Sequence, residues 1–166
     1  MPFPRTSGIL LHPTSFPGPH GIGDLGIQAR QFIDFLAQSG QQLWQILPLG
    51  PTGFGNSPYM CFSAMAGNSL LISLDDLVEQ RFLNASDLQG CPDFDPDFVE
   101  FDQVADWKTT LLQKASRGFK ENASSAVRSQ FDVFCQAKAH WLEDYALFMA
   151  LLDSQPGNIW SEWPID

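Results

Sequence analysis

Two apolar runs flank a helical pattern near the start of the chain, and this order most constrains the fold. Ile9–Leu11 with its neighbours predicts a short buried strand. Residues 25–36 place apolar side chains on one helix face, and Gly40 is suited to end that helix. Residues 43–49 predict a second strand, almost continuously apolar as in parallel sheets. The sequence therefore predicts a strand–helix–strand unit of the α/β class.

The rest of the chain is predicted to be mostly helical. Residues 70–74 suggest a short extended segment, and Asp102 can cap a helix that reaches about Arg117. Ser124 or Ser125 can cap a longer helix that ends at Pro156-Gly157. One strand–helix–strand unit leaves sheet edges without partners. We therefore expect these residues to be a piece of a longer protein, truncated at position 166.

Residues 21–26, GIGDLG, match the glycine pattern of dinucleotide-binding loops. In such loops the first glycine directly follows the strand, whereas Gly21 comes well after Leu11 and three prolines. The acidic residue expected about 20 positions later is missing, because Trp44 stands there. Asp24 also places a negative charge where a pyrophosphate would sit. We interpret the glycines as a turn into the helix, without a nucleotide site.

Charge and composition exclude several classes of function. The chain has a net charge of −10 with only 17% charged residues, so it has no basic surface for nucleic acid or anionic membranes. A neutral ligand such as a sugar is compatible with this balance. No apolar stretch approaches the length of a membrane span, and no signal peptide is recognised. Three cysteines without metal-ligand spacing predict free, mostly buried thiols in a cytoplasmic protein and no metal site.

No complete catalytic set is found. The many carboxylates are predicted to be helix caps or solvated surface, and DFDPDF at 93–98 lacks the glycine and glutamate of a calcium loop. His12 and His20 can each contact a ligand, although a structural role is favoured for both. Nothing suggests a nucleophile–histidine pair of the kind that hydrolases use.

Three segments carry a resemblance to a known family. They are SGILLHPTSFPGPHGIGDLG (7–26), LWQILPLGPTGFGNSPYMCFSAMAGNSLLISLDDL (43–77) and WLEDYALFMAL (141–151). Together they resemble the 4-α-glucanotransferases, the amylomaltases or disproportionating enzymes of glycoside hydrolase family 77. The resemblance implies a (β/α)₈ TIM barrel with helical insertions. Residues 1–75 would be its first strand–helix–strand part and 76–166 a mostly helical insertion, leaving the barrel incomplete in this chain.

The resemblance also implies a reaction and a site. Family members transfer part of an α-1,4-glucan to a 4-hydroxyl group through a covalent intermediate on an aspartate, with a glutamate as acid/base and no cofactor. Those catalytic carboxylates lie on later strands, and none of their motifs occurs here. Tyr59 matches the family residue that lines the donor-sugar subsite, and Ser57 matches a nearby contact. Asn56 and Phe54 are further substrate-binding candidates, although Phe54 lacks the hydroxyl of the tyrosine found in some members.

Two hypotheses follow from this resemblance. The first is the N-terminal part of a 4-α-glucanotransferase that acts on α-1,4-glucans and maltooligosaccharides. The second is a truncated, non-catalytic module that binds glucans or a partner protein through Tyr59 and Ser57. Without the resemblance, the favoured interpretation of Tyr59 is an aromatic side chain packed in a proline-rich loop.

Overall fold

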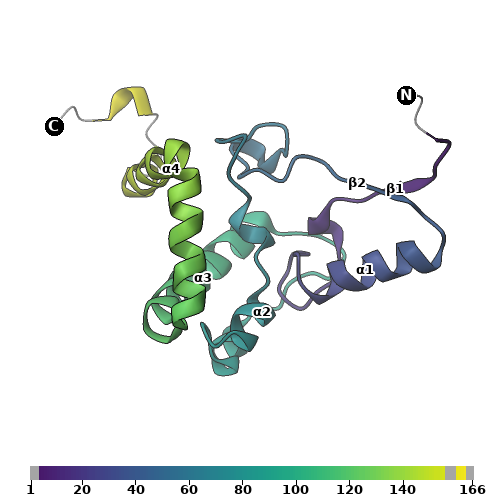
Figure 1. Cartoon of the computed structure of the whole chain (residues 1–166), viewed down its shortest axis with the longest axis horizontal. Helices are drawn as coiled ribbons and strands as arrows, with labels where there is room; N and C mark the ends of the chain where they lie inside the picture. Colours follow the sequence, from purple (N-terminus) through teal and green to yellow (C-terminus); the bar gives the residue numbers. More distant parts are fainter. Residues whose placement is uncertain (1–3, 156–159, 164–166) are drawn as a thin grey trace. The chain divides into compact units, whose positions relative to one another are not determined.

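A two-stranded parallel sheet begins the fold (Figure 1). The computed structural model describes residues 4–155 and 160–163, and the side chains of Phe54 and Glu162 lie outside that description. Strand β1 spans Gly8–Leu10 and strand β2 spans Leu43–Gln45. Gly8 pairs with Leu43 and Leu10 with Gln45, which confirms the predicted parallel arrangement.

Strand β2 is shorter than the apolar run that predicted it. Pairing stops at Gln45 because β1 offers only three residues and the chain turns away at His12-Pro13. The backbone amide of Leu11 still donates to the Gln45 carbonyl oxygen at 3.0 Å. The segment 46–49 therefore leaves the sheet as a loop.

Helix α1, Ile27–Gln38, connects the two strands and packs through aromatic rings. The ring centroids of Phe16 and Phe32 are 5.2 Å apart, and Trp44 lies 5.3 Å from Phe32. Trp44 also donates its indole N–H to the Leu11 carbonyl oxygen at 2.8 Å. Gly40 follows the helix with a φ of 69°, as expected for a glycine that ends a helix.

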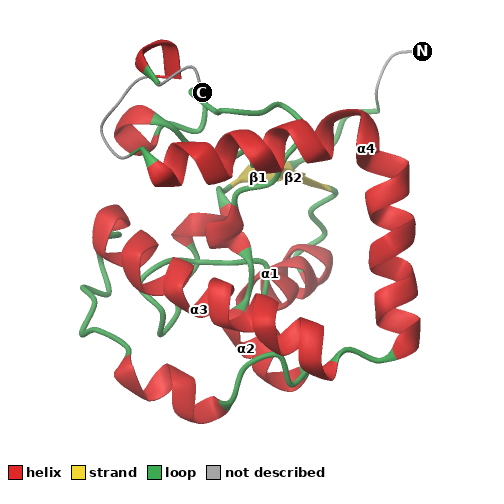
Figure 2. Cartoon of the chain, turned by 90° about the vertical axis from the view of Figure 1, so that its left-hand side faces the viewer, coloured by secondary structure: helices red, strands yellow, loops and turns green. Residues whose placement is uncertain are grey.

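Helices make up most of the remaining chain (Figure 2). The α-helices after β2 are α2 (Leu74–Glu79), α3 (Phe101–Asn122) and α4 (Ser125–Ser154). Short 3₁₀ helices are η1 (Pro13–Ser15), η2 (Phe54–Asn56), η3 (Ser69–Leu71), η4 (Ala85–Gly90) and η5 (Trp160–Glu162).

Three local predictions need correction. Residues 70–74 are not extended: Asn68 caps η3 with its side chain, and Ser73 caps α2. Helix α3 starts after Glu100, so Asp102 lies in its first turn and does not cap it. The thiols are free as expected, but none of the three is buried: Cys61 is exposed, and Cys91 and Cys135 are half-buried, because the segments that carry them lie outside the core.

The chain divides into two compact units, residues 1–123 and 124–166. In the first unit, α3 buries Leu111 and Ala115 against Leu74 of α2 and Leu83. In the second unit, Ser124 caps α4 as predicted, by accepting from the Val127 amide. The expected stop at Pro156-Gly157 lies outside the described residues. No helix among residues 4–155 and 160–163 is long and apolar enough to cross a membrane.

Candidate functional site

A cavity of about 220 Å³ lies beyond the C-terminal ends of both strands. His12 follows β1 and Leu47 follows β2, so the loops after the two parallel strands share this cavity. The C-terminal edge of a parallel sheet is the usual place for a ligand site. The lining residues are His12, Thr14, Ser15, Leu47, Thr52, Asn56, Pro58, Asn68 and Phe101.

The loop after β2 is a folded hairpin. Thr52 and Cys61 form an antiparallel bridge, and the Gly53 amide donates to the Met60 carbonyl oxygen at 2.8 Å. At its tip, Asn56 has a φ of 55°, a left-handed conformation that asparagine tolerates better than most residues. These bonds give the candidate residues a defined backbone.

The predicted site residues lie on this hairpin, but only one of them lines the cavity. Asn56 is half-buried and forms part of the wall. Ser57 accepts from the Tyr59 amide at 3.3 Å, which fixes the turn between them. Tyr59 is 71% exposed and lies outside the cavity wall. Phe54 begins η2, and its side chain is not described.

Several cavity residues were not singled out by the sequence. Asn68 and Thr14 line the wall, and Phe101 reaches it from the start of α3. Thr14 could have been found from the sequence, because it comes shortly after β1 and residues at that end of a parallel strand often line a site. Asn68 and Phe101 carried no local signal, because their place depends on contacts with distant segments.

His12 is held in one orientation at the cavity. The Thr14 amide donates to His12 Nδ1 at 3.4 Å, and the Thr14 hydroxyl lies 2.8 Å from the same atom. Since a backbone amide can only donate, Nδ1 is the acceptor and the ring proton lies on Nε2. Nε2 is buried and has no partner among the described residues. The side chain also caps η1, which agrees with the structural role favoured for it.

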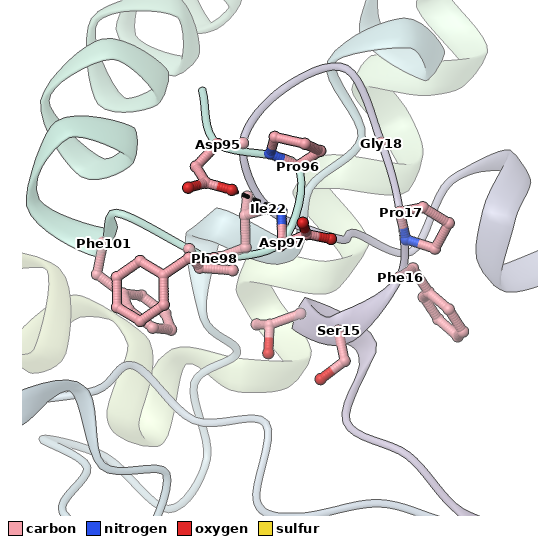
Figure 3. A pocket seen from close by; sticks show the side chains of 13 residues that line it. Ser15, Phe16, Pro17, Gly18, Ile22, Asp95, Pro96, Asp97, Phe98 and Phe101 are labelled. Atoms are coloured by element: carbon pink, nitrogen blue, oxygen red, sulfur yellow. Dashed lines mark hydrogen bonds between the residues drawn. The ribbon is translucent and has the colours of Figure 1, made fainter. Parts of the chain in front are cut away.

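A second hollow of about 430 Å³ shares Thr14, Ser15 and Phe101 with the first (Figure 3). Asp95 and Asp97 lie on its other side, both exposed, and Asp95 accepts from the Asp97 amide at 2.8 Å. This agrees with the expectation that these carboxylates are solvated surface. No group of three or more metal-ligating side chains occurs in the part of the chain that the structure describes.

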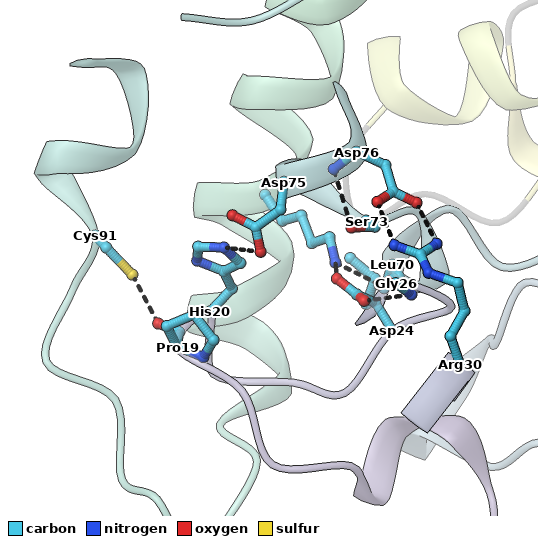
Figure 4. A network of polar contacts seen from close by, with 11 residues as sticks. Pro19, His20, Asp24, Gly26, Arg30, Leu70, Ser73, Asp75, Asp76 and Cys91 are labelled. Atoms are coloured by element: carbon cyan, nitrogen blue, oxygen red, sulfur yellow. Dashed lines mark hydrogen bonds and ion pairs between the residues drawn. The ribbon is translucent and has the colours of Figure 1, made fainter. Parts of the chain in front are cut away.

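A polar network supports the loop after β1 (Figure 4). Asp24 is only 7% exposed and accepts from the Gly26 amide at 2.8 Å, so it is neither solvated nor the N-cap of α1, which is Gly26. Its second carboxylate oxygen lies 3.6 Å from Nζ of Lys108, which is fully buried. Burial lowers the pKa of Lys108, and the carboxylate of Asp24 opposes that shift.

Two further pairs connect the first part of the chain to α2. Arg30 makes two hydrogen bonds of 2.9 Å to Asp76, which hold the pKa of that carboxyl below its usual value. His20, 6% exposed, lies 3.3 Å from Asp75. His20 directly precedes the GIGDLG segment, and Arg30 lies in the helix that follows it. The carboxylate of Asp24 accepts from the Gly26 amide at the start of α1, so that amide is not available to a nucleotide phosphate.

The comparisons with known proteins agree with one another. The family model described as 4-alpha-glucanotransferase, glycoside hydrolase family 77, matches residues 11–166. The chain belongs to this family.

Individual 4-alpha-glucanotransferases are similar over nearly the whole chain. The protein from Synechocystis is 54% identical over 98% of this chain and 32% of its own length. The protein from Thermus thermophilus is 49% identical over 99% of this chain and 32% of its own length. The chain therefore spans about a third of the length of the glucanotransferases that it matches.

The solved amylomaltase from Streptococcus agalactiae, in complex with acarbose, has the same fold over this region. Its TM-score is 0.88 at 38% sequence identity, covering 96% of this chain and 32% of that one. The two parallel strands and the helices described above thus correspond to part of the amylomaltase fold.

Proposed function

We propose that the protein containing these residues is a 4-alpha-glucanotransferase that acts on α-1,4-glucans and maltooligosaccharides. Residues 1–75 would form the first strand–helix–strand part of a (β/α)₈ barrel, and 76–166 a mostly helical insertion. The cavity beyond β1 and β2 carries this proposal, because barrel enzymes place their sites at the C-terminal ends of the strands. Family membership supplies the reaction class.

The chemistry in this proposal is a retaining transfer. The bond from C1 of the donor glucose to the leaving 4-oxygen breaks, and C1 forms an ester with an aspartate while an acid gives that oxygen its proton. The 4-hydroxyl of the acceptor then attacks C1 and returns its proton to the same acid/base. The carboxylates would lie outside the present sequence, and no cofactor or metal takes part.

This chain would contribute binding of the donor sugar. Tyr59 would present its ring to the apolar face of a glucose unit, and Asn56 and Ser57 would hydrogen-bond hydroxyl groups. Phe54 would add a ring without a hydroxyl. The hairpin bonds support this role, because a rigid loop loses little entropy on binding. The free cysteines support a cytoplasmic location, which is part of the proposal.

Replacing Tyr59 with alanine in the full-length protein should lower kcat/KM for maltotriose roughly tenfold to a hundredfold, as expected for an aromatic side chain that anchors a ligand. Y59F should retain most of the activity, because it keeps the ring. Glucose released from maltotriose measures transfer directly, since two maltotriose molecules give glucose and maltopentaose.

M60A is the matched control, because Met60 is the neighbouring exposed side chain of the same hairpin. Its kcat/KM should stay within about twofold of the wild type. Equal activity of Y59A and M60A would refute the sugar contact. Glucan binding by the full-length wild type without any glucose release would favour the alternative of a non-catalytic binding module.

A further inference from the structure

Lys108 lies on α3 and contacts two segments that border the cavity, the loop after β1 and the segment after the hairpin. Its side chain is fully buried, and Nζ donates to the Leu70 carbonyl oxygen at 2.7 Å. The same nitrogen lies 3.6 Å from the carboxylate of Asp24. One turn earlier on α3, Val104 packs against Ile22 and Leu70. The same part of α3 therefore contacts the loop after β1 and the segment after the hairpin.

The contact with Leu70 leads directly to the cavity wall. The Leu70 amide donates to the side-chain oxygen of Asn68 at 2.9 Å, and Asn68 lines the cavity. Leu70 is thus held on both sides, by Asn68 at its N–H and by Lys108 at its carbonyl. Because the oxygen of Asn68 is engaged, its NH₂ group is the part that can donate to a ligand hydroxyl.

The contact with Asp24 leads to the same cavity from the other side. The amide of Gly23, next to Asp24, donates to the Thr14 carbonyl oxygen at 3.0 Å, and Thr14 lines the cavity. The Leu25 amide donates to the Leu71 carbonyl oxygen at 3.0 Å, which connects the loop after β1 to the segment after the hairpin. Displacing Lys108 would therefore remove support from both Asn68 and Thr14 in the cavity wall.

A lysine in this position requires an explanation other than stability. A buried ion pair contributes no more to folding than well-packed apolar side chains of similar volume. A methionine at 108 could fill the space but could not bond a backbone carbonyl. What the lysine provides is a directed hydrogen bond to Leu70 and an attraction to Asp24, which together fix the orientation of two loops.

We propose that Lys108 is a positioning residue for the glucan site, acting through Asn68. This inference rests on the proposed function and deepens it, because it assigns a role in sugar binding to a residue of α3 that does not line the cavity. Asn68 is the group that contacts the sugar, and Lys108 keeps it in place.

The test uses the full-length protein and two variants, K108M and K108M/D24N. The double variant removes both charges and keeps an acceptor for the Gly26 amide, so it remains testable if K108M alone does not fold. Both should raise KM for maltotriose and lower kcat/KM roughly tenfold to a hundredfold, because a small displacement of a binding group has effects of this size. A purely structural role would reduce the amount of active enzyme and lower the apparent kcat at unchanged KM.

Asn68 supplies the second readout. N68A alone should raise KM, and adding N68A to K108M/D24N should raise it little further, because both changes remove the same contact. K114M is the control, since Lys114 also lies on α3 but is half exposed and pairs with Asp87, which does not line the cavity. Its KM should equal that of the wild type.

Three outcomes would overturn the proposal in different ways. An unchanged KM in both Lys108 variants, with an active wild type, would refute the positioning role alone. Multiplicative effects of N68A and K108M/D24N would show that Lys108 does not act through Asn68. A full-length wild type that releases no glucose from maltotriose would refute the proposed function, and this inference with it.

Discussion

The K108M substitution should lower the free energy of unfolding by about 3–5 kcal/mol, the range seen when one partner of a buried ion pair is removed. The reason is that Asp24, 7% exposed, would keep its carboxylate inside the protein with the Gly26 amide as its remaining hydrogen-bond donor. The Leu70 carbonyl oxygen would also lose its bond to Nζ. Urea unfolding followed by circular dichroism measures the change.

The compensating variant makes this prediction specific. K108M/D24N should be more stable than K108M alone, because asparagine carries no charge and still accepts from the Gly26 amide. K114M should lower stability less than K108M, because Lys114 is half exposed and Asp87 keeps the Asn84 amide as a hydrogen-bond donor. If K108M unfolds at the same urea concentration as the wild type, the buried pair does not stabilise the loops.

Replacing Gly23 with alanine should destabilise the protein by roughly 3 kcal/mol, at the upper end for overpacking. A Cβ at this position would overlap the Pro13 carbonyl oxygen and lie 2.6 Å from the Phe16 amide nitrogen. Both are backbone atoms of the turn around η1, so no side-chain rotation can relieve the clash. The midpoint of urea unfolding should fall accordingly.

Gly18 is the matched control in the same loop. A Cβ there would have an ordinary contact of 3.8 Å to the Ile22 carbonyl oxygen. G18A should therefore leave the unfolding midpoint nearly unchanged or raise it slightly, because alanine restricts the unfolded chain. Similar losses in G18A and G23A would mean that the close approach at Gly23 does not matter.

The strand–helix–strand start could be predicted from the sequence because its signals are local. Apolar runs at 9–11 and 43–49 and the periodic pattern between them each reflect a single element. The resemblance to the family, and not local order, led to the loop after β2 as the candidate site, and Asn56 of that loop lines the cavity beyond the strands. The roles of Asn56, Ser57, Tyr59 and Phe54 in binding sugar remain predictions.

The supporting network could not be predicted in this way. A lysine on a helix is normally expected at the surface, and Lys108 is buried only because two distant loops provide a carboxylate and a carbonyl for it. Asp24 was expected to be a helix cap or solvated, because its partner Lys108 is far away in the sequence. The run at 70–74 was wrongly predicted to be extended, since short apolar runs do not distinguish strands from helical turns and Asn68 decides the outcome through its side chain.

The bond from Lys108 to Leu70 spans 38 positions of the chain and determines when the cavity wall can form during synthesis. A ribosome delivers residues in order, so the hairpin and η3 emerge before α3 exists. Until Lys108 is available, the Leu70 carbonyl oxygen and the second carboxylate oxygen of Asp24 depend on water in its place. The loops that line the cavity are therefore completed late, by a helix that is made after them.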